Sequence, residues 1–206
     1  MNIEKIRNGI LDENAYLIYL AEGGDAVIID PGSEPEIFLS VLKQKNLNLT
    51  HILLTHGHFD HIGAAAQIKE ATGAPIAIHE KDKKCLSSSV ASLAVFKFKS
   101  ITPTEADIIL SDGQEIEILG RNFTVIHTPG HTPGSCCFLT GDILFSGDTL
   151  FLETIGRTDF PGSSSKQMSE SLAKIAPFDC TVYPGHGSVT TMEHERAYNF
   201  FLRRAI

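Results

Sequence analysis

The sequence lacks several features that mark particular classes of protein. Its 206 residues contain no apolar run that approaches the roughly 18–20 residues needed to cross a bilayer. The N-terminal stretch Met1–Arg7 lacks the basic and then apolar pattern of a secretion signal. We therefore expect a cytoplasmic protein without a membrane partner.

Clustered positive charge is also scarce. The chain has 17 Lys and Arg against 25 Asp and Glu, a net charge of −8, and its small basic groups are Lys81–Lys84 and Arg203–Arg204. Proteins that bind nucleic acid neutralise phosphates with many Lys and Arg. The charge balance argues against a nucleic-acid partner and leaves a small-molecule substrate, while nothing in the sequence specifies an oligomeric state.

The four cysteines, Cys85, Cys136, Cys137 and Cys180, show no Cys-x-x-Cys spacing. Cys136 and Cys137 are neighbours in a predicted strand, so their side chains should face opposite sides of a sheet. We expect neither a disulfide framework nor a thiolate metal site, but reduced cysteines packed in a core.

The organisation of the chain predicts one domain over residues 1–206, because no repeat or Pro/Gly linker divides it. Short apolar runs predict strands at Tyr16–Leu20, Ala26–Ile29, His51–Leu54, Pro75–Ile78, Ile116–Leu119, Phe123–His127, Cys136–Leu139, Ile143–Ser146 and Thr181–Tyr183. Helical periodicity marks Glu34–Lys45, after a Ser33 cap, and also Ile62–Thr72, Ser165–Ile175 and Met192–Arg204, where Ala197, Phe200 and Phe201 share a face. Two strand clusters with helices at their ends predict an α/β fold of two packed sheets with helices outside.

The segment Lys81–Ala106 fits neither the strand pattern nor the helix pattern. It either covers substrate near the site or is a surface connection.

The strongest motif is Thr55-His56-Gly57-His58-Phe59-Asp60-His61, directly after the apolar strand Ile52–Leu54. It places four possible metal ligands within six residues, in a loop at the end of a strand, where sites in layered α/β proteins gather. His56 and His58 can point the same way and hold one cation, while Asp60 and His61 can turn toward a second.

Three further candidates also follow apolar strands. His131 lies in Thr128–Ser135, Asp148 follows the strand Ile143–Ser146, and His186 follows Thr181–Tyr183. Four strand ends would then deliver ligands to one edge of the sandwich. All seven donors are nitrogen or oxygen, a set that suits zinc and also iron or manganese.

These motifs resemble the metallo-β-lactamase-fold hydrolases, whose shared pattern is HxHxDH followed by a later His, Asp and His. The resemblance covers nearly the whole chain up to His186. Within that group, Thr128–Ser135, Ser146–Thr149 and Gly156–Pro161 look most like glyoxalase II, a hydroxyacylglutathione hydrolase. Full-length glyoxalase II adds a C-terminal helical domain, and the roughly twenty residues after His186 resemble instead its shorter, single-domain microbial relatives.

The resemblance implies a four-layer αββα sandwich with two metal ions in a cleft along one edge. Of the metals that suit the donors, we expect zinc first. The resemblance also implies one ion on His56, His58 and His131, another on Asp60, His61 and His186, and Asp148 between them. Such a pair can activate water for attack on a thioester, ester or lactone carbonyl. Asp60 is the candidate to orient that nucleophile and accept its proton. Arg157 either meets an anionic substrate group or braces its loop together with Asp159.

Other activities share this pattern. A persulfide dioxygenase has a similar Gly-Arg-Thr-Asp-Phe motif but uses one iron and oxygen, and a lactonase would carry the same ligands. A true β-lactamase fits less well, since Asp148 stands where the best-known periplasmic enzymes have cysteine. A binding module with structural metals is disfavoured, because structural zinc sites are usually closed and rich in cysteine.

Overall fold

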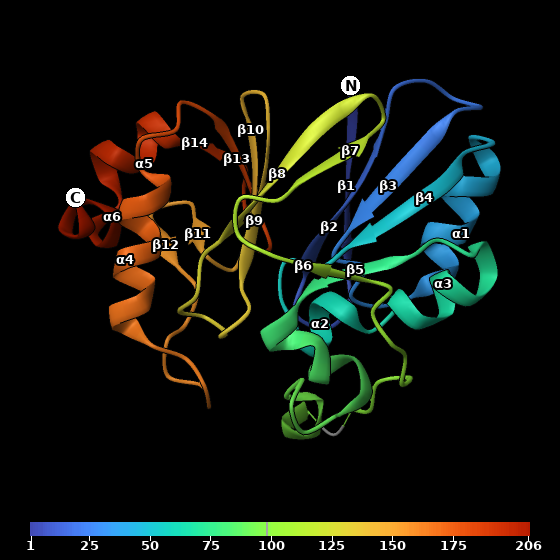
Figure 1. Ribbon diagram of the computed structural model, residues 1–206, viewed down its shortest axis with the longest axis horizontal. Coiled ribbons are helices and arrows are strands. Elements are labelled where there is room, and N and C mark those ends of the chain that lie inside the picture. Colours follow the sequence, from blue (N-terminus) through green and yellow to red (C-terminus); the bar gives the residue numbers. More distant parts are fainter. Residues whose placement is uncertain (98) are drawn as a thin grey trace.

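Two six-stranded β-sheets lie face to face in the computed structural model, which describes residues 1–97 and 99–206 (Figure 1). Helices α1 and α3 lie outside the first sheet, and α4, α5 and α6 lie outside the second (Figure 1). The fold is therefore the predicted αββα sandwich. None of the helices among the described residues combines the length and the apolar character that crossing a membrane requires.

The first sheet has the spatial order β1 (Asn2–Asn8), β2 (Glu13–Tyr19), β3 (Asp25–Ile29), β4 (Asn48–Leu53), β5 (Ile76–His79) and β6 (Ile108–Leu110). Strands β1 to β3 are antiparallel, whereas β3 to β6 run parallel. The parallel pairing brings the carboxyl ends of β3, β4 and β5 to one edge of the sheet. Sequence analysis missed β1 and β6, which occupy the edges and are not fully buried.

The second sheet has the order β14 (Thr190–Thr191), β13 (Thr181–Pro184), β10 (Ile143–Gly147), β9 (Cys136–Thr140), β8 (Arg121–His127) and β7 (Glu115–Ile118). Only the β10–β13 pair is parallel among these described strands. A small hairpin of β11 (Leu150–Phe151) and β12 (Thr154–Ile155) follows β10. All nine predicted strands are thus present, each within a few residues of its expected bounds.

The α-helices are α1 (Pro35–Gln44), α2 (Phe59–Ile62), α3 (Ala65–Thr72), α4 (Ser165–Ile175), α5 (Met192–Tyr198) and α6 (Phe200–Ala205). Two 3₁₀ helices, η1 (Glu80–Ser87) and η2 (Ala94–Lys97), lie in the segment that matched neither pattern. The predicted helix Ile62–Thr72 corresponds to α3, which begins three residues later, and its first residue, Ile62, is the last residue of α2. The cap of α1 is Glu34 rather than Ser33, with a left-handed backbone (φ 55°) and no capping side chain.

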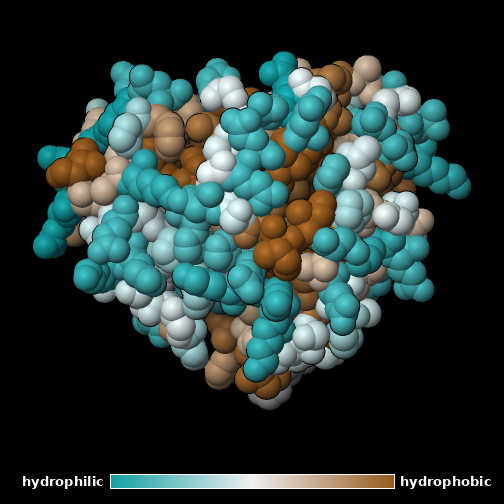
Figure 2. All heavy atoms as spheres, in the orientation of Figure 1, coloured by the Kyte–Doolittle hydropathy of each residue, from teal (hydrophilic) through white to brown (hydrophobic). Residues whose placement is uncertain are grey.

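The predicted C-terminal helix Met192–Arg204 is broken at Asn199. The backbone turns there, and Oδ1 of Asn199 accepts hydrogen bonds from the N–H groups of Phe201 and Leu202, which begins a new helix. The break turns Leu202 into the core and leaves Phe200 59% exposed and Phe201 43% exposed. The single apolar face expected for this helix was therefore wrong. Figure 2 shows a small group of hydrophobic atoms at the left of the molecule, on the side where Figure 1 places the C-terminus.

Three buried clusters correspond to the three contacts between the four layers. The cluster between the sheets includes Tyr16, Ile18, Val27, Leu53, Phe123, Phe138 and Phe145. The outer clusters join Phe38 and Ile68 to the first sheet, and Met168 and Leu172 to the second. Cys136 faces the space between the sheets and Cys137 faces the helices, as the alternation of a strand predicts. The cysteines are free, and all except the half-buried Cys85 are buried.

Candidate metal centre

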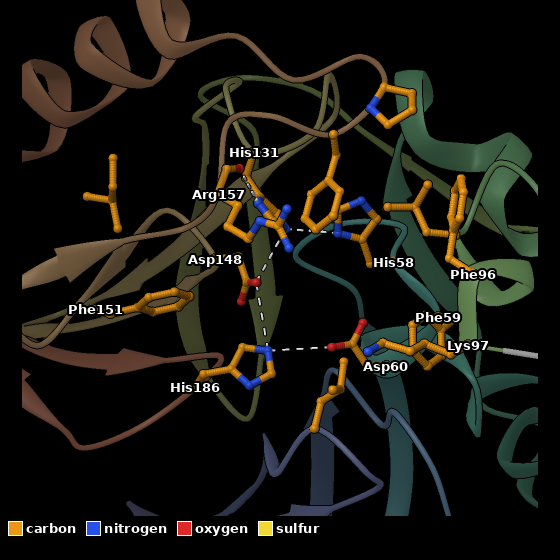
Figure 3. A pocket seen from close by; sticks show the side chains of 15 residues that line it. His58, Phe59, Asp60, Phe96, Lys97, His131, Asp148, Phe151, Arg157 and His186 are labelled. Carbon is orange, nitrogen blue, oxygen red and sulfur yellow. Dashed lines mark hydrogen bonds and ion pairs between the residues drawn. The ribbon is translucent and has the colours of Figure 1, made fainter.

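Seven side chains named from the sequence meet at one edge of the sandwich. His56 and His58 lie in the loop after β4, and Asp60 and His61 lie in the short helix α2; His131 follows β8, Asp148 follows β10, and His186 follows β13. Figure 3 shows five of them, His58, Asp60, His131, Asp148 and His186, around one cavity. The carboxyl ends of four strands, one from the first sheet and three from the second, therefore supply the whole set.

The first group consists of His56, His58 and His131, whose ligand atoms all lie within 4.8 Å of one another. All three side chains are buried. Nδ1 of His58 lies 2.8 Å from Nε2 of His131 (Figure 3). Three imidazole nitrogens that converge in this way are a typical set for a divalent transition metal.

The second group consists of Asp60, His61 and His186, also within 4.8 Å. Oδ2 of Asp60 lies 3.5 Å from Nε2 of His186 and 3.9 Å from Nε2 of His61. The Asp60 carboxylate thus faces both imidazoles across one small space.

Asp148 lies between the two groups. Its Oδ2 is 3.3 Å from Nε2 of His131 in the first group and 3.8 Å from Nε2 of His186 in the second. Its Oδ1 is 3.4 Å from Nε2 of His61. Ligands bound at about 2.0–2.2 Å to one tetrahedral ion lie roughly 3.3–3.6 Å apart. The separations of Asp148 from His131 and from His61 match that spacing, and its separation from His186 is slightly longer.

The residues fit two cations by a second criterion. Nε2 of His56, Nε2 of His61 and Oδ1 of Asp148 are buried and have no hydrogen-bond partner. Buried polar atoms almost always have a partner, so three orphans at one point call for a missing group. Since each of these atoms is a lone-pair donor and no cysteine joins them, they fit cations that accept nitrogen and oxygen ligands.

Hydrogen bonds from outside the set orient the imidazoles. Nδ1 of His61 donates to Oδ2 of Asp30 at 3.0 Å, and Nδ1 of His131 donates to the carbonyl of Arg157 at 2.8 Å. Nδ1 of His56 lies 3.1 Å from the hydroxyl of Thr55. Each of these contacts occupies Nδ1 and leaves Nε2 facing the centre, as in many metal sites.

Sequence analysis did not single out Asp30, although the signal was present. Asp30 directly follows the apolar strand β3, in the same position relative to its strand as the chosen candidates. It lies within 4.8 Å of His56 and His61 and could be counted as a ligand. Because its carboxylate instead accepts hydrogen bonds from His61 and from Thr55, we assign it a supporting role.

The electrostatics of the two groups differ. Burial, together with the neighbouring His131, lowers the pKa of His58 to about 3, and burial also lowers the pKa of His56. Although burial opposes it, the carboxylates of Asp148 and Asp30 raise the pKa of His61 well above its usual value. His56 and His58 are therefore neutral, with free lone pairs, whereas the carboxylates around His61 favour positive charge at that residue.

The cavity above the centre has a volume of about 650 Å³. Its lining combines the candidate ligands with a mainly apolar wall of Leu11, Phe59, Leu93, Phe96, Phe151, Ile155 and Phe160. Leu93, Phe96 and Lys97 come from the segment 81–106, so part of that segment belongs to the site. A cavity of this size and character can hold a small organic substrate.

Arg157 lines the cavity as well, but its guanidinium is already paired. Nε and an Nη atom lie 2.8 and 2.7 Å from the two carboxylate oxygens of Asp159, and the guanidinium stacks on Phe160 at 4.2 Å. The predicted bracing contact with Asp159 is thus present. Contact of Arg157 with substrate stays a prediction.

The remaining four histidines lie outside the cavity lining. His79 and His127 stack in parallel, with ring centroids 4.2 Å apart, and His194 forms a surface pair with Glu153. His51 is half-buried in β4 and contacts Thr50.

Comparisons with known proteins agree with this geometry. Hydroxyacylglutathione hydrolase GloC of Haemophilus influenzae is 41% identical over 214 aligned residues, which cover 98% of both chains. The crystal structure of the BLEG-1 B3 metallo-beta-lactamase superimposes with a TM-score of 0.92 at 36% identity, covering 98% of this chain and 99% of the other. The structure of TTHA1623 in a di-iron-bound form superimposes with a TM-score of 0.84 at 39% identity, and the match covers 96% of this chain and 99% of the other. The structure of ETHE1 from Myxococcus xanthus superimposes with a TM-score of 0.80 at 30% identity, and the match covers 97% of this chain and 84% of the other.

These relatives and the His/Asp clusters support a metal-dependent hydrolase. The sequence profile of the metallo-beta-lactamase superfamily matches residues 8–186, which include all seven candidate ligands. The chain therefore belongs to the metallo-beta-lactamase superfamily.

Proposed function

We propose that this protein is a binuclear metal-dependent hydrolase of thioesters, with S-D-lactoylglutathione as the leading substrate candidate. The observation that carries the proposal is Asp148, whose two oxygens face His131 of one group and His61 of the other at the base of the cavity. The 41% identity to a hydroxyacylglutathione hydrolase supports the choice of a thioester.

The proposed ligands assign the seven residues to two ions. His56, His58 and His131 would hold one, Asp60, His61 and His186 the other, and Asp148 would contact both. When bound, the two ions would supply an activated water and polarise the thioester carbonyl. Zinc is our first choice of metal, with iron and manganese as alternatives; the TTHA1623 relative holds two irons.

The residues of the chain would contribute positioning and proton transfer. Although burial opposes it, the hydrogen bond with His186 and the nearby His61 lower the pKa of Asp60, so its carboxylate stays ionised and can accept a hydrogen bond from the attacking water. The apolar wall that includes Phe59 and Phe151 would exclude bulk water from the acyl group. Hydrolysis then breaks the C–S bond and yields a carboxylate and a thiol, which needs no strong acid because a thiolate leaves readily.

The test is a substrate panel on protein of measured metal content: S-D-lactoylglutathione, a second thioester, a lactone, a β-lactam and glutathione persulfide. We expect thiol release from a thioester, abolished by chelation and restored by metal. Asp148→Asn should abolish it, while Asp142→Asn, the same change at an exposed position, should leave it intact. One iron per chain with oxygen consumption on the persulfide would replace the hydrolase proposal by a dioxygenase.

A further inference from the structure

The carboxylate of Asp82, in η1, connects two of the loops that carry the candidate ligands. Its Oδ2 accepts hydrogen bonds from the backbone N–H of Gly57 at 2.9 Å and from the hydroxyl of Thr132 at 2.6 Å. Its Oδ1 accepts from the backbone N–H of Gly134 at 2.8 Å. Gly57 separates His56 from His58, and Thr132 follows His131 directly. One side chain thus binds both loops of the first group.

Asp82 is 1% exposed and has no ion-pair partner among the described residues. Burying an ionised carboxylate is costly unless hydrogen bonds satisfy it. Here the three donors are two backbone N–H groups and one hydroxyl, all from ligand loops. The stability of this buried group therefore depends on holding those loops in place.

Two glycines allow this close approach. A Cβ at position 134 would lie 2.5 Å from Cγ of Asp82, and a Cβ at position 57 would lie 2.5 Å from Cβ of Cys85 in the same 3₁₀ helix. Both loops therefore press against η1 at positions where a larger residue would collide.

The helix η1 is itself fixed to the second loop. Its cap, His79, accepts a hydrogen bond from the N–H of Lys81 at 3.3 Å and stacks on His127. His127 in turn donates from Nε2 to the carbonyl of Pro133 at 3.0 Å. The scaffold that presents Asp82 is thus anchored beside His131, at the junction of the two sheets.

The hydrogen bonds of Asp82 go to the loops of the first group alone, whereas Asp30 contacts both His61 and Thr55, the residue before His56. The backbone bond from Cys136 N–H to the Thr55 carbonyl, 2.8 Å, is a further link between the loops of the first group. The second group receives no hydrogen bond from Asp82; it is held by Asp30 on His61 and by Asn14, whose N–H donates to the carbonyl of Gly185 next to His186.

We propose that Asp82 is a positioning residue for the ion held by His56, His58 and His131, and that it acts on this ion rather than on the ion of the second group. The proposal rests on the metal centre of the proposed function, but not on the identity of the substrate. Replacing a residue that orients metal ligands typically weakens the affinity for the metal by roughly 10–100-fold.

The experiment measures metal affinity directly, in two backgrounds. In His186→Ala, where the second site is damaged, Asp82→Asn should weaken the remaining zinc or cobalt(II) by roughly 10–100-fold in a chelator competition. In His58→Ala, where the first site is damaged, Asp82→Asn should leave the remaining affinity unchanged. The absorption spectrum of the cobalt(II) protein, which reports ligand geometry, should change only in the first background.

Thr132→Val, which removes one of the three hydrogen bonds, should reproduce a smaller part of the effect and guards against a misfolded Asp82 variant. Asp142→Asn is the exposed control. Equal losses in both backgrounds, or none in either, would overturn the proposal. Because no substrate enters these measurements, a failure to hydrolyse thioesters would reject the proposed function and leave the role of Asp82 untouched.

Discussion

Nδ1 of His61 donates a hydrogen bond to Oδ2 of Asp30 over 3.0 Å, while the same carboxylate accepts from the backbone N–H of Thr55. Asp30 directly follows β3, Thr55 lies in the loop after β4, and His61 lies in α2. One buried carboxylate at the end of β3 therefore holds both the loop after β4 and the helix that follows it. It fixes the ring of His61 with Nε2 toward Asp148. The position of a candidate ligand is thus set by a residue that has no place in the ligand set.

Replacing Asp30 by Asn should therefore weaken the second ion. The amide keeps one acceptor but puts an NH₂ group opposite a donor, so the His61 ring loses its fixed orientation. We expect a loss of roughly 10–100-fold in affinity for the ion of Asp60, His61 and His186. Metal analysis after dialysis against graded chelators measures it, with exposed Asp25→Asn as the control. Two tightly held ions in the Asp30 variant would contradict this reading.

Arg157 contributes to the site through two different groups. Its backbone carbonyl accepts from Nδ1 of His131, whereas its guanidinium lies 66% exposed at the cavity and pairs with Asp159. Arg157→Ala keeps the carbonyl, so metal content should not change. If the guanidinium meets an anionic substrate, KM should rise several-fold with little change in kcat. Asp159→Asn, which frees the guanidinium, is the matched comparison. An unchanged KM in Arg157→Ala would show that the Arg157 side chain does not contact substrate and only braces its loop.

The stack of His79 on His127 predicts a dependence of stability on pH. Burial, with smaller contributions from His127 and Lys81, lowers the pKa of His79 from 6.5 to about 4, and the nearby carboxylates of Glu80 and Asp112 only partly oppose this. Below pH 6.5 the unfolded chain gains a proton at this residue that the folded protein does not take up. Stability from His79 is therefore present above that pH and is lost between about 6.5 and 4.

His79→Gln should make that decline shallower. Urea unfolding at pH 7.5 and at pH 5 measures the difference in the free energy of unfolding, and His194→Gln, an exchange at a surface histidine, serves as control. An identical decline in wild type and His79→Gln would show that the depressed pKa is not realised in the protein.

The space between the sheets should dominate stability. Phe145 in β10 is fully buried there, with its ring 5.4 Å from those of Tyr16 and Tyr183. Phe145→Ala should cost about 3–5 kcal/mol of unfolding free energy, the usual cost of truncating a buried phenylalanine. Phe200→Ala removes the same atoms from a ring that is 59% exposed and should change stability by about 0.5 kcal/mol or less. Comparable losses at both positions would show that α6 is covered in solution.

The sequence determined the strands of the core and the seven candidate residues, because both depend on local patterns. Apolar runs of strand length mark β4, β8, β10 and β13 wherever they pair, and a metal ligand directly after such a run is visible without knowing its neighbours. The edge strands β1 and β6 were not predicted, because strands that are only partly buried have a weaker apolar pattern in the sequence. The break at Asn199 was not predicted, because the helical pattern continues on both sides of it and conceals the capping role of Asn199.

The resemblance implied how the seven residues divide into two groups, but only the tertiary structure shows the distances between them and what holds them in place. That Asp148 lies between His131 and His61 follows from parallel strands delivering their carboxyl ends to one edge, a relation between segments far apart in the chain. Asp82 shows the same limit more sharply, because unlike Asp30 it does not directly follow an apolar strand at the ligand edge of the first sheet. A carboxylate that braces a ligand carries no spacing of its own, since its role comes from which donors the folded chain brings within 3 Å of it.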